Sequence, residues 1–373
     1  MKKTWTLPAS QTQKRKFLEL AAISGEFPAE LLSHLQGSPS YKETIIWSLK
    51  KEKLLKTYYR DKLRGYRLGT RAKAALLSEA PERFSFFLTG NTDTNLLKSE
   101  LSRRLRLHRL AETYVFMQNA NVSIFRDEKP DIFSGNAPSA VRLAVPSFYN
   151  SREIKEIGME AVKISGSRMM GALLAPSGLF LVYNSGPYTA RWDYRAEQRA
   201  KTLIENFVFF RCFPGQHSLL SAQGILLASG MEPFFQLLSG ADSGNRCFFL
   251  LDGNYEHFYY FTRDHPGETL MRLLCDPDKT ASLNALLSQD LEPSVPGLLL
   301  ENDAVDSRGN PVLFGYFLDI PRISRFLSGL QLQERTGTLI CFDFQRDILN
   351  RLCGEYVQLQ SVSFEKFERR FFP

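Results

Sequence analysis

Four basic side chains lie within eight residues of one stretch, LLKTYYRDKLRGYRL, which begins at Leu54. They are Arg60, Lys62, Arg64 and Arg67, and the acid among them is Asp61. Like charges held this close repel one another, and a bound polyanion relieves the repulsion while releasing its own counterions. The spacing therefore predicts the binding of phosphates.

A set of polar side chains precedes this cluster. Ile45, Ile46 and Leu49 have the spacing of one buried face of a helix over YKETIIWSLKKEK. Ser40, with Glu43 three residues later, predicts a capping box at the start of this helix. The opposite face would present groups that contact base edges and phosphates. Its residues are Ser40, Tyr41, Lys42, Thr44, Trp47, Ser48 and Lys51. For Trp47, a half-buried place in the core is at least as good an interpretation.

The elements around these side chains follow the order of a winged helix-turn-helix. Residues 12–24 predict a first helix, and PAELLSHL, from Pro28, predicts a second short helix before the one described above. LLKTYY and YRL are strand-like and predict a hairpin, the wing, with Gly65 in its turn. RAKAALLSEA then predicts a helix that Thr70 caps and Pro81 ends.

A long helical run from Asn91 contains the arginine-rich segment SRRLRLHRL. Arg103 and Arg104 of this segment extend the predicted set of phosphate-binding residues. Pairing of these arginines with Glu100 and Glu112 on a solvated helix is an equally good interpretation.

The charge of the chain is unevenly distributed. Residues 1–113 hold 22 Lys and Arg against 11 Asp and Glu, a net charge of +11. Residues 114–373 hold 25 basic and 29 acidic residues, a net charge of −4. This pattern is expected when one module binds a polyanion and another has a different task. A merely uneven surface charge is the alternative.

The rest of the chain alternates strand-like and helix-like segments, which predicts a mixed α/β domain. Two hairpins are expected in it, turning at 176–178 and at 252–253. The predicted fold class is therefore α+β. It comprises a winged helix-turn-helix over residues 1–83, a connecting helix over 84–120, and a scaffold or partner-binding domain over 121–373.

Motifs for catalysis are absent from the sequence. It has no phosphate-binding glycine loop and no paired-histidine metal motif, and its five His are scattered. Nucleases of the PD-(D/E)xK class bind Mg²⁺ through acids beside a lysine on adjacent strands, whereas MMGALLAPSGLFLVYNSG contains neither type of residue. Acids that remain for a divergent nuclease are Asp252, Glu256, Asp343 and Asp347. We expect no catalytic residue, no metal and no cofactor.

The sequence also gives expectations about location. It has no run of about 18 apolar residues that would span a membrane, and MKKTWTLPAS lacks the apolar stretch of a secretory signal. The five Cys are widely spaced and show no Cys-x-x-Cys pair. We expect a cytoplasmic protein with no membrane partner.

The segments SGEFPAELLSHL, YYRDKLRGYRL and SRRLRLHRLAETY resemble uncharacterised winged-helix proteins of conjugative and integrative elements of gut Firmicutes. This resemblance runs along most of the chain and includes FFLLDGNYEHFYYF and GTLICFDFQRDIL. More loosely, the chain is similar to the replication-relaxation family of plasmids and mobile elements. In that family a winged helix-turn-helix precedes a domain reminiscent of restriction endonucleases, so the resemblance implies a degenerate form of that fold in the body.

We therefore expect a sequence-specific protein that binds double-stranded DNA of a mobile genetic element. Its role would be replication, transfer-origin recognition in conjugation, or transcription regulation, and its C-terminal domain would be non-catalytic. Two alternatives stay open: a divergent metal-dependent nuclease, and a winged helix used as a protein–protein interaction module. A second copy of the chain and other proteins of the element are further partners that the prediction leaves open.

Overall fold

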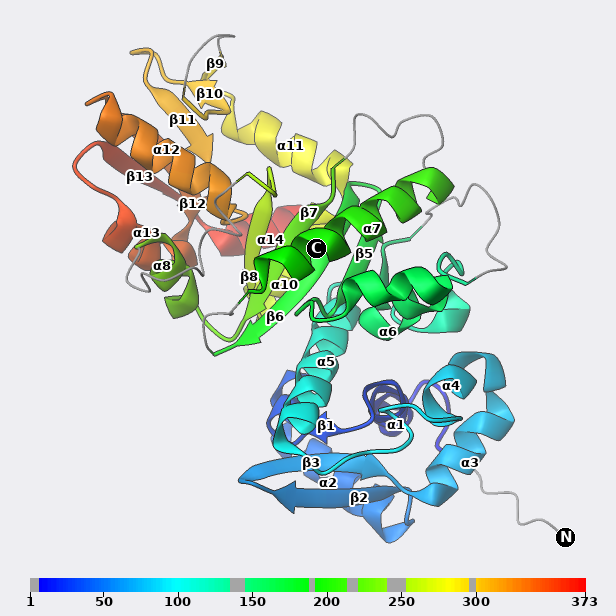
Figure 1. Cartoon of the computed structure of the whole chain (residues 1–373). Coiled ribbons are helices and arrows are strands. Elements are labelled where there is room, and N and C mark those ends of the chain that lie inside the picture. The colour runs from blue at the N-terminus through cyan, green and yellow to red at the C-terminus, as the bar shows by residue number, and fades with distance from the viewer. Residues whose placement is uncertain (1–6, 135–144, 188–191, 213–220, 240–252, 295–299) are drawn as a thin grey trace, which may run out of the picture. The chain divides into compact units, whose positions relative to one another are not determined.

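The computed structural model of the chain describes residues 7–134, 145–187, 192–212, 221–239, 253–294 and 300–373. Within these ranges it is an α+β protein with one three-stranded and two five-stranded sheets, which confirms the predicted class. The chain divides into two compact units (Figure 1). The first comprises Met1–Asn119 and Ser123–Pro130, and the second comprises Ala120–Val122 and Asp131–Pro373.

The first unit begins with helix α1, Gln13–Ser24, whose N-cap hydroxyl on Thr12 accepts a hydrogen bond from the backbone of Arg15. The α-helix expected over PAELLSHL is replaced by a two-residue strand, β1 (Phe27–Pro28), and a 3₁₀ helix, η1 (Glu30–His34). The reason is that Phe27 and Pro28 pair with residues 65–66 of a later strand. The Phe27 ring is buried, with its centroid 4.8 Å from that of Phe17. Only the residues after Pro28 therefore remain available for a helix.

Helix α2, Pro39–Lys51, has its N-cap at Ser38, two residues before the expected cap Ser40. The hydroxyl of Ser38 accepts a hydrogen bond from the Tyr41 N–H, and Pro39 occupies the first helical position. The predicted capping box of Ser40 and Glu43 is therefore wrong, because Ser38 already fills the N-cap position.

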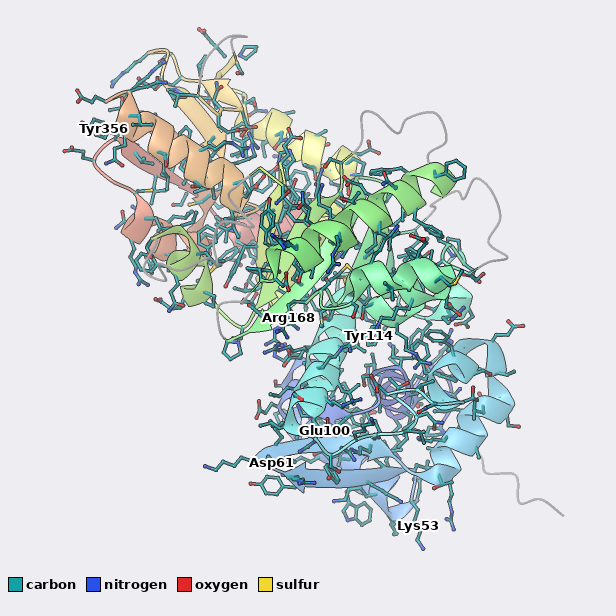
Figure 2. All side chains as sticks on the ribbon, in the orientation of Figure 1. Lys53, Asp61, Glu100, Tyr114, Arg168 and Tyr356 are labelled. Carbon is teal, nitrogen blue, oxygen red and sulfur yellow. The ribbon has the colours of Figure 1, made fainter. Side chains whose placement is uncertain are left out.

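Strands β2 (Leu55–Arg60) and β3 (Leu63–Leu68) form the expected hairpin, with Arg60 paired to Leu63 at its end. Asp61 and Lys62 make the turn, with φ of 51° and 59°, as in the two-residue turns that hairpins favour. Gly65 is inside β3, opposite Tyr58, so its expected place in the turn is wrong. Figure 2 shows Asp61 at the tip of the hairpin and Lys53 near its base. β1 pairs with the other edge of β3.

Residues 84–120 do not form one connecting helix. They contain the end of α4, an irregular segment, and α5, which packs against α1 and β1 and belongs to the first unit up to Asn119. The helical run expected from Asn91 begins only at Leu101, because Thr92 and Thr94 bond to the Phe87 carbonyl and favour a turn. The remaining helices of this unit are α3 (Thr70–Glu79), α4 (Pro81–Leu88), α5 (Leu101–Asn119) and η2 (Arg126–Glu128).

The second unit contains a sheet of order β4-β5-β6-β7-β8. Its first three strands are antiparallel and its last three parallel. The turn expected at 176–178 joins β5 to β6. Residues 240–252 lie outside the described residues, and they include Asp252 and the first half of the other expected hairpin. Helix α7 crosses this sheet and contributes to its core (Figure 1). The bounds are β4 Ser147–Asn150, β5 Gly171–Ala175, β6 Gly178–Gly186, β7 Gln223–Ala228 and β8 Phe258–Thr262, with α6 Ser151–Ile154, η3 Lys155–Ile164, α7 Tyr194–Cys212 and α8 Glu232–Leu238.

A sheet of order β13-β12-β11-β10-β9 completes the second unit. β11, β12 and β13 are parallel, and β9, β10 and β11 antiparallel. One hydrophobic cluster includes Leu181 and Leu226 of the first sheet of this unit and Leu339 of the second. The bounds are β9 Glu292–Pro293, β10 Ala304–Val305, β11 Pro311–Phe314, β12 Gly337–Phe342 and β13 Val357–Val362, with α10 His265–Leu274, α11 Pro277–Leu287, α12 Ile320–Leu332, η4 Asp343–Gln345, α13 Arg346–Leu352 and α14 Phe364–Phe371. None of the described helices combines the length and the apolar character needed to cross a lipid bilayer.

Candidate nucleic-acid interface

Helix α2 has the two faces that its sequence predicts. Ile45, Ile46 and Leu49 are buried, and the opposite side carries an exposed stripe. The indole of Trp47 is 63% exposed, and the Lys51 ammonium lies 4.9 Å from its ring centroid. The half-buried interpretation of Trp47 is therefore wrong. The exposed residues of the predicted set on α2 are Ser40, Tyr41, Thr44, Trp47 and Lys51.

Three predicted residues of α2 already have partners, and one of them is Thr44, whose hydroxyl donates to the Ser40 carbonyl at 2.9 Å. The Lys42 ammonium donates to the Ser33 carbonyl at 3.0 Å. The Ser48 hydroxyl accepts from the Lys14 ammonium and donates to Glu52, both at 2.8 Å. Lys42 and Ser48 would have to exchange these partners before they could contact another molecule.

The tip of the hairpin is basic and exposed. Arg60, Lys62 and Arg64 are all exposed, and the ion pair of Arg60 with Asp61 is long, at 3.6 Å. A solvated pair of this kind contributes little free energy and breaks easily. The three cations can therefore be offered to an anion.

Several exposed residues near these groups were missed by the sequence analysis. Tyr59 lies opposite Arg64 in the hairpin, and Lys50, Lys53 and Lys56 are exposed between α2 and β2. The basic run LKKEK was the signal for two of these lysines.

Arg104 does not belong to the exposed set. Its side chain is 0% exposed, and its guanidinium binds the Glu26 carboxylate at 2.6 Å. It also donates to the backbone carbonyls of Arg60 and Leu63, the two residues that flank the hairpin turn. The prediction that Arg104 binds phosphate is corrected: this arginine holds the hairpin to α5.

Arg67 is also part of this buried cluster. Its side chain is 13% exposed and pairs with Glu26 at 2.6 Å. The Tyr58 ring lies 3.6 Å from the Arg67 guanidinium carbon and 4.7 Å from that of Arg104. The predicted phosphate contact of Arg67 is replaced by this internal ion pair.

Glu26 is the centre of the cluster and has no solvent exposure. His108 Nε2 lies 2.9 Å from one of its carboxylate oxygens. Burial alone would raise the pKa of Glu26, but hydrogen bonds with His108, Arg104 and Arg67 outweigh it and lower the pKa to about 2. A Cβ atom at Gly65 would overlap this carboxylate, so the glycine makes room for Glu26 beneath β3.

Arg103, next to Arg104 in sequence, is 45% exposed on its side chain. It pairs with Glu100 at 2.9 Å and with Asp93 at 3.5 Å. This arrangement agrees with the alternative of a solvated, charge-paired helix.

The hairpin and α2 lie next to each other, as one buried residue shows. Burial raises the pKa of Tyr66 in β3, the Arg64 charge opposes this rise, and the Glu43 charge of α2 adds to it. The Tyr66 hydroxyl is therefore within electrostatic reach of both elements, which agrees with the packing of α2 against β2.

The described residues of the second unit do not gather the acids that a metal-dependent nuclease needs. Asp343 follows β12 and accepts hydrogen bonds from the backbone of Phe344 and Phe364. Glu256 and Asp347 are exposed, and Asp252 lies outside the described residues. Among the residues that the structure describes, no group of three His, Cys, Asp or Glu side chains could hold a metal ion.

Two buried carboxylates of the second unit were missed from sequence. Asp319 lies 2.6 Å from Nδ1 of His257 and accepts from the Phe258 N–H. Glu197 accepts from the Ser167 hydroxyl and the Arg168 N–H, and burial raises its pKa. Both carboxylates accept hydrogen bonds from other segments of the unit, so we assign them a role in stabilising the fold.

Comparison of the chain with protein-family models, curated proteins and solved structures found no match. The function therefore has to be inferred from the side chains described above.

Proposed function

We propose that the first unit is a winged helix-turn-helix that binds double-stranded DNA. In this proposal α2 is the recognition helix and the hairpin of β2 and β3 is the wing. The order of α1, η1, α2 and the hairpin supports the assignment, because the second helix of such a motif enters the major groove. The net charge of +11 on residues 1–113 supports a polyanionic ligand.

The observation that carries the proposal is that two neighbouring elements of the first unit expose groups with complementary chemistry. The α2 stripe offers three hydroxyls, an indole and an ammonium group, and the hairpin tip offers three exposed cations. Hydroxyl and aromatic groups suit base edges, whereas Lys and Arg suit phosphates. The proposed division of labour is that Ser40, Thr44 and Trp47 contact bases, and that Arg60, Lys62 and Arg64 contact the backbone.

For the second unit we propose a non-catalytic scaffold that recruits partners. Strands β5 and β6 contain no acid and no lysine, and the candidate acids Glu256, Asp343 and Asp347 are exposed. Self-association of this unit, or recruitment of other proteins of a mobile element, would fit such a scaffold. The proposed roles are replication, transfer-origin recognition or transcriptional control on that element.

A selection of bound duplexes from a genomic pool, combined with affinity measurements at increasing salt, tests the proposal. We expect submicromolar to nanomolar binding that weakens steeply with salt, as phosphate contacts require. An origin among the recovered sequences would indicate replication or transfer, and a promoter would indicate transcriptional control. No binding to any duplex, or binding that ignores salt, would refute DNA binding.

A further inference from the structure

Glu43 is the single acidic residue of α2, and its carboxylate has no structural task among the described residues. Its expected role in a capping box is taken by Ser38. The side chain is exposed, and no described group forms a hydrogen bond or ion pair with it.

Glu43 lies at one edge of the exposed face of α2. Its charge acts on the Tyr66 hydroxyl, which the Arg64 charge also influences. In the helical order of α2, Glu43 lies between the buried Ile46 and the exposed Trp47. The carboxylate is therefore at the border of the proposed recognition stripe, in the first half of the helix.

A carboxylate at this place weakens contact with phosphates, because like charges repel. It can contribute favourably only by accepting hydrogen bonds, since an ionised carboxylate has no donor. In the major groove, cytosine presents its N4 amino group as a donor without a neighbouring acceptor, and Glu and Asp are the side chains that accept from it. Adenine presents a donor beside an acceptor, a pattern that suits Asn or Gln better.

We propose that Glu43 is a specificity-determining residue that accepts a hydrogen bond from the N4 amino group of one cytosine in the bound DNA. This inference rests on the proposed function. In this inference Glu43 selects one base pair of the site. Its negative charge weakens non-specific binding to phosphates, and the cations of the wing offset this loss of affinity.

The experiment compares the sequences selected by the full-length wild type, by Glu43→Gln and by Glu82→Gln. Glu82 is an exposed acid of α4 in the same unit, so its variant has the same change in charge. We expect both variants to fold, because neither side chain is buried. In Glu43→Gln the preference at one position should shift from cytosine toward adenine, because the amide adds a donor beside the acceptor, and the discrimination there should change on the order of 10-fold to 100-fold. Glu82→Gln should keep the wild-type preference.

The outcomes separate this inference from the proposed function. A wild-type protein that binds no duplex overturns both. A wild-type protein that binds DNA overturns the inference alone if it has no cytosine preference, or if Glu43→Gln keeps the same preference and only binds all sequences more tightly.

Discussion

At the scale of single residues, two adjacent arginines have different surroundings. Arg104 is buried and bound to Glu26, whereas Arg103 is exposed and pairs with acids at the surface. Removing one partner of a buried ion pair leaves an uncompensated charge, which typically costs about 3–5 kcal/mol. Removing a partner of an exposed pair costs about 1 kcal/mol or less.

We therefore predict that Arg104→Gln lowers the free energy of unfolding of the first unit by about 3–5 kcal/mol. Arg103→Gln is the matched control and should lower it by about 1 kcal/mol at most. Denaturant unfolding of both variants measures the difference. Equal losses of stability in the two variants would contradict the assignment of Arg104 to the buried cluster.

Glu26 should make the stability of the same unit depend on pH. Its pKa is lowered from 4.5 to about 2 by the folded structure. A depressed pKa stabilises the fold above the unfolded value, and this contribution is lost as the pH falls toward the folded value. We predict that Glu26→Gln lowers Tm at neutral pH, and that the gap to the wild type narrows from about pH 4.5 to about pH 2. Thermal unfolding across this range measures the gap, and a constant gap would contradict the prediction.

At the scale of elements, the hairpin of β2 and β3 depends on a glycine in β3. A side chain at Gly65 would overlap the Glu26 carboxylate, whereas a Cβ at Gly354 would meet no heavy atom within 4 Å. We predict that Gly65→Ala destabilises the first unit by about 1–3 kcal/mol, as overpacking does. The control Gly354→Ala should change stability little. Urea unfolding compares the two, and a tolerated Gly65→Ala would show that β3 does not need the space.

Local sequence patterns predicted which helices and strands form in this unit. They predicted less well which residues contact one another across those elements. The spacing of Ile45, Ile46 and Leu49 determines which face of α2 is buried, and the Tyr and Leu content of LLKTYY and YRL was enough to predict a hairpin. The predicted position of the turn was wrong because Asp61 and Lys62, rather than a glycine, adopt the positive φ that the turn requires. Gly65, which could adopt such a φ without strain, lies in β3 instead. The burial of Arg104 was hidden because its partner Glu26 is 78 residues away in sequence.

At the scale of the whole molecule, the first unit extends beyond the expected border at residue 83. Its buried cluster needs Arg104 and His108 of α5. A fragment of residues 1–130 should therefore fold cooperatively, whereas a fragment of residues 1–83 should lose about 3–5 kcal/mol because the buried Glu26 no longer has Arg104 and His108 as partners.

Circular dichroism and denaturant unfolding of the two fragments measure this difference. Glu26→Gln should harm the short fragment less than the long one, because the short one has already lost two partners of the carboxylate. Equal stability of the two fragments would contradict a role of α5 in the fold of the first unit.

The charge of the whole chain is concentrated where the proposed interface lies, since residues 1–113 carry +11 and the remainder carries −4. If Arg60, Lys62 and Arg64 contact phosphates, each contact contributes about 0.9 to the slope of log K against log salt concentration. The most direct test of DNA binding by the wing is this slope, measured for the wild type and for the triple variant Arg60→Gln, Lys62→Gln and Arg64→Gln.

We predict that the slope becomes shallower by about 2.7 in the triple variant, because about three counterions are no longer released. A control in which the exposed Arg308, Arg346 and Arg370 of the second unit are changed to Gln should keep the wild-type slope. An unchanged slope in the wing variant, or an equal change in the control, would contradict the account.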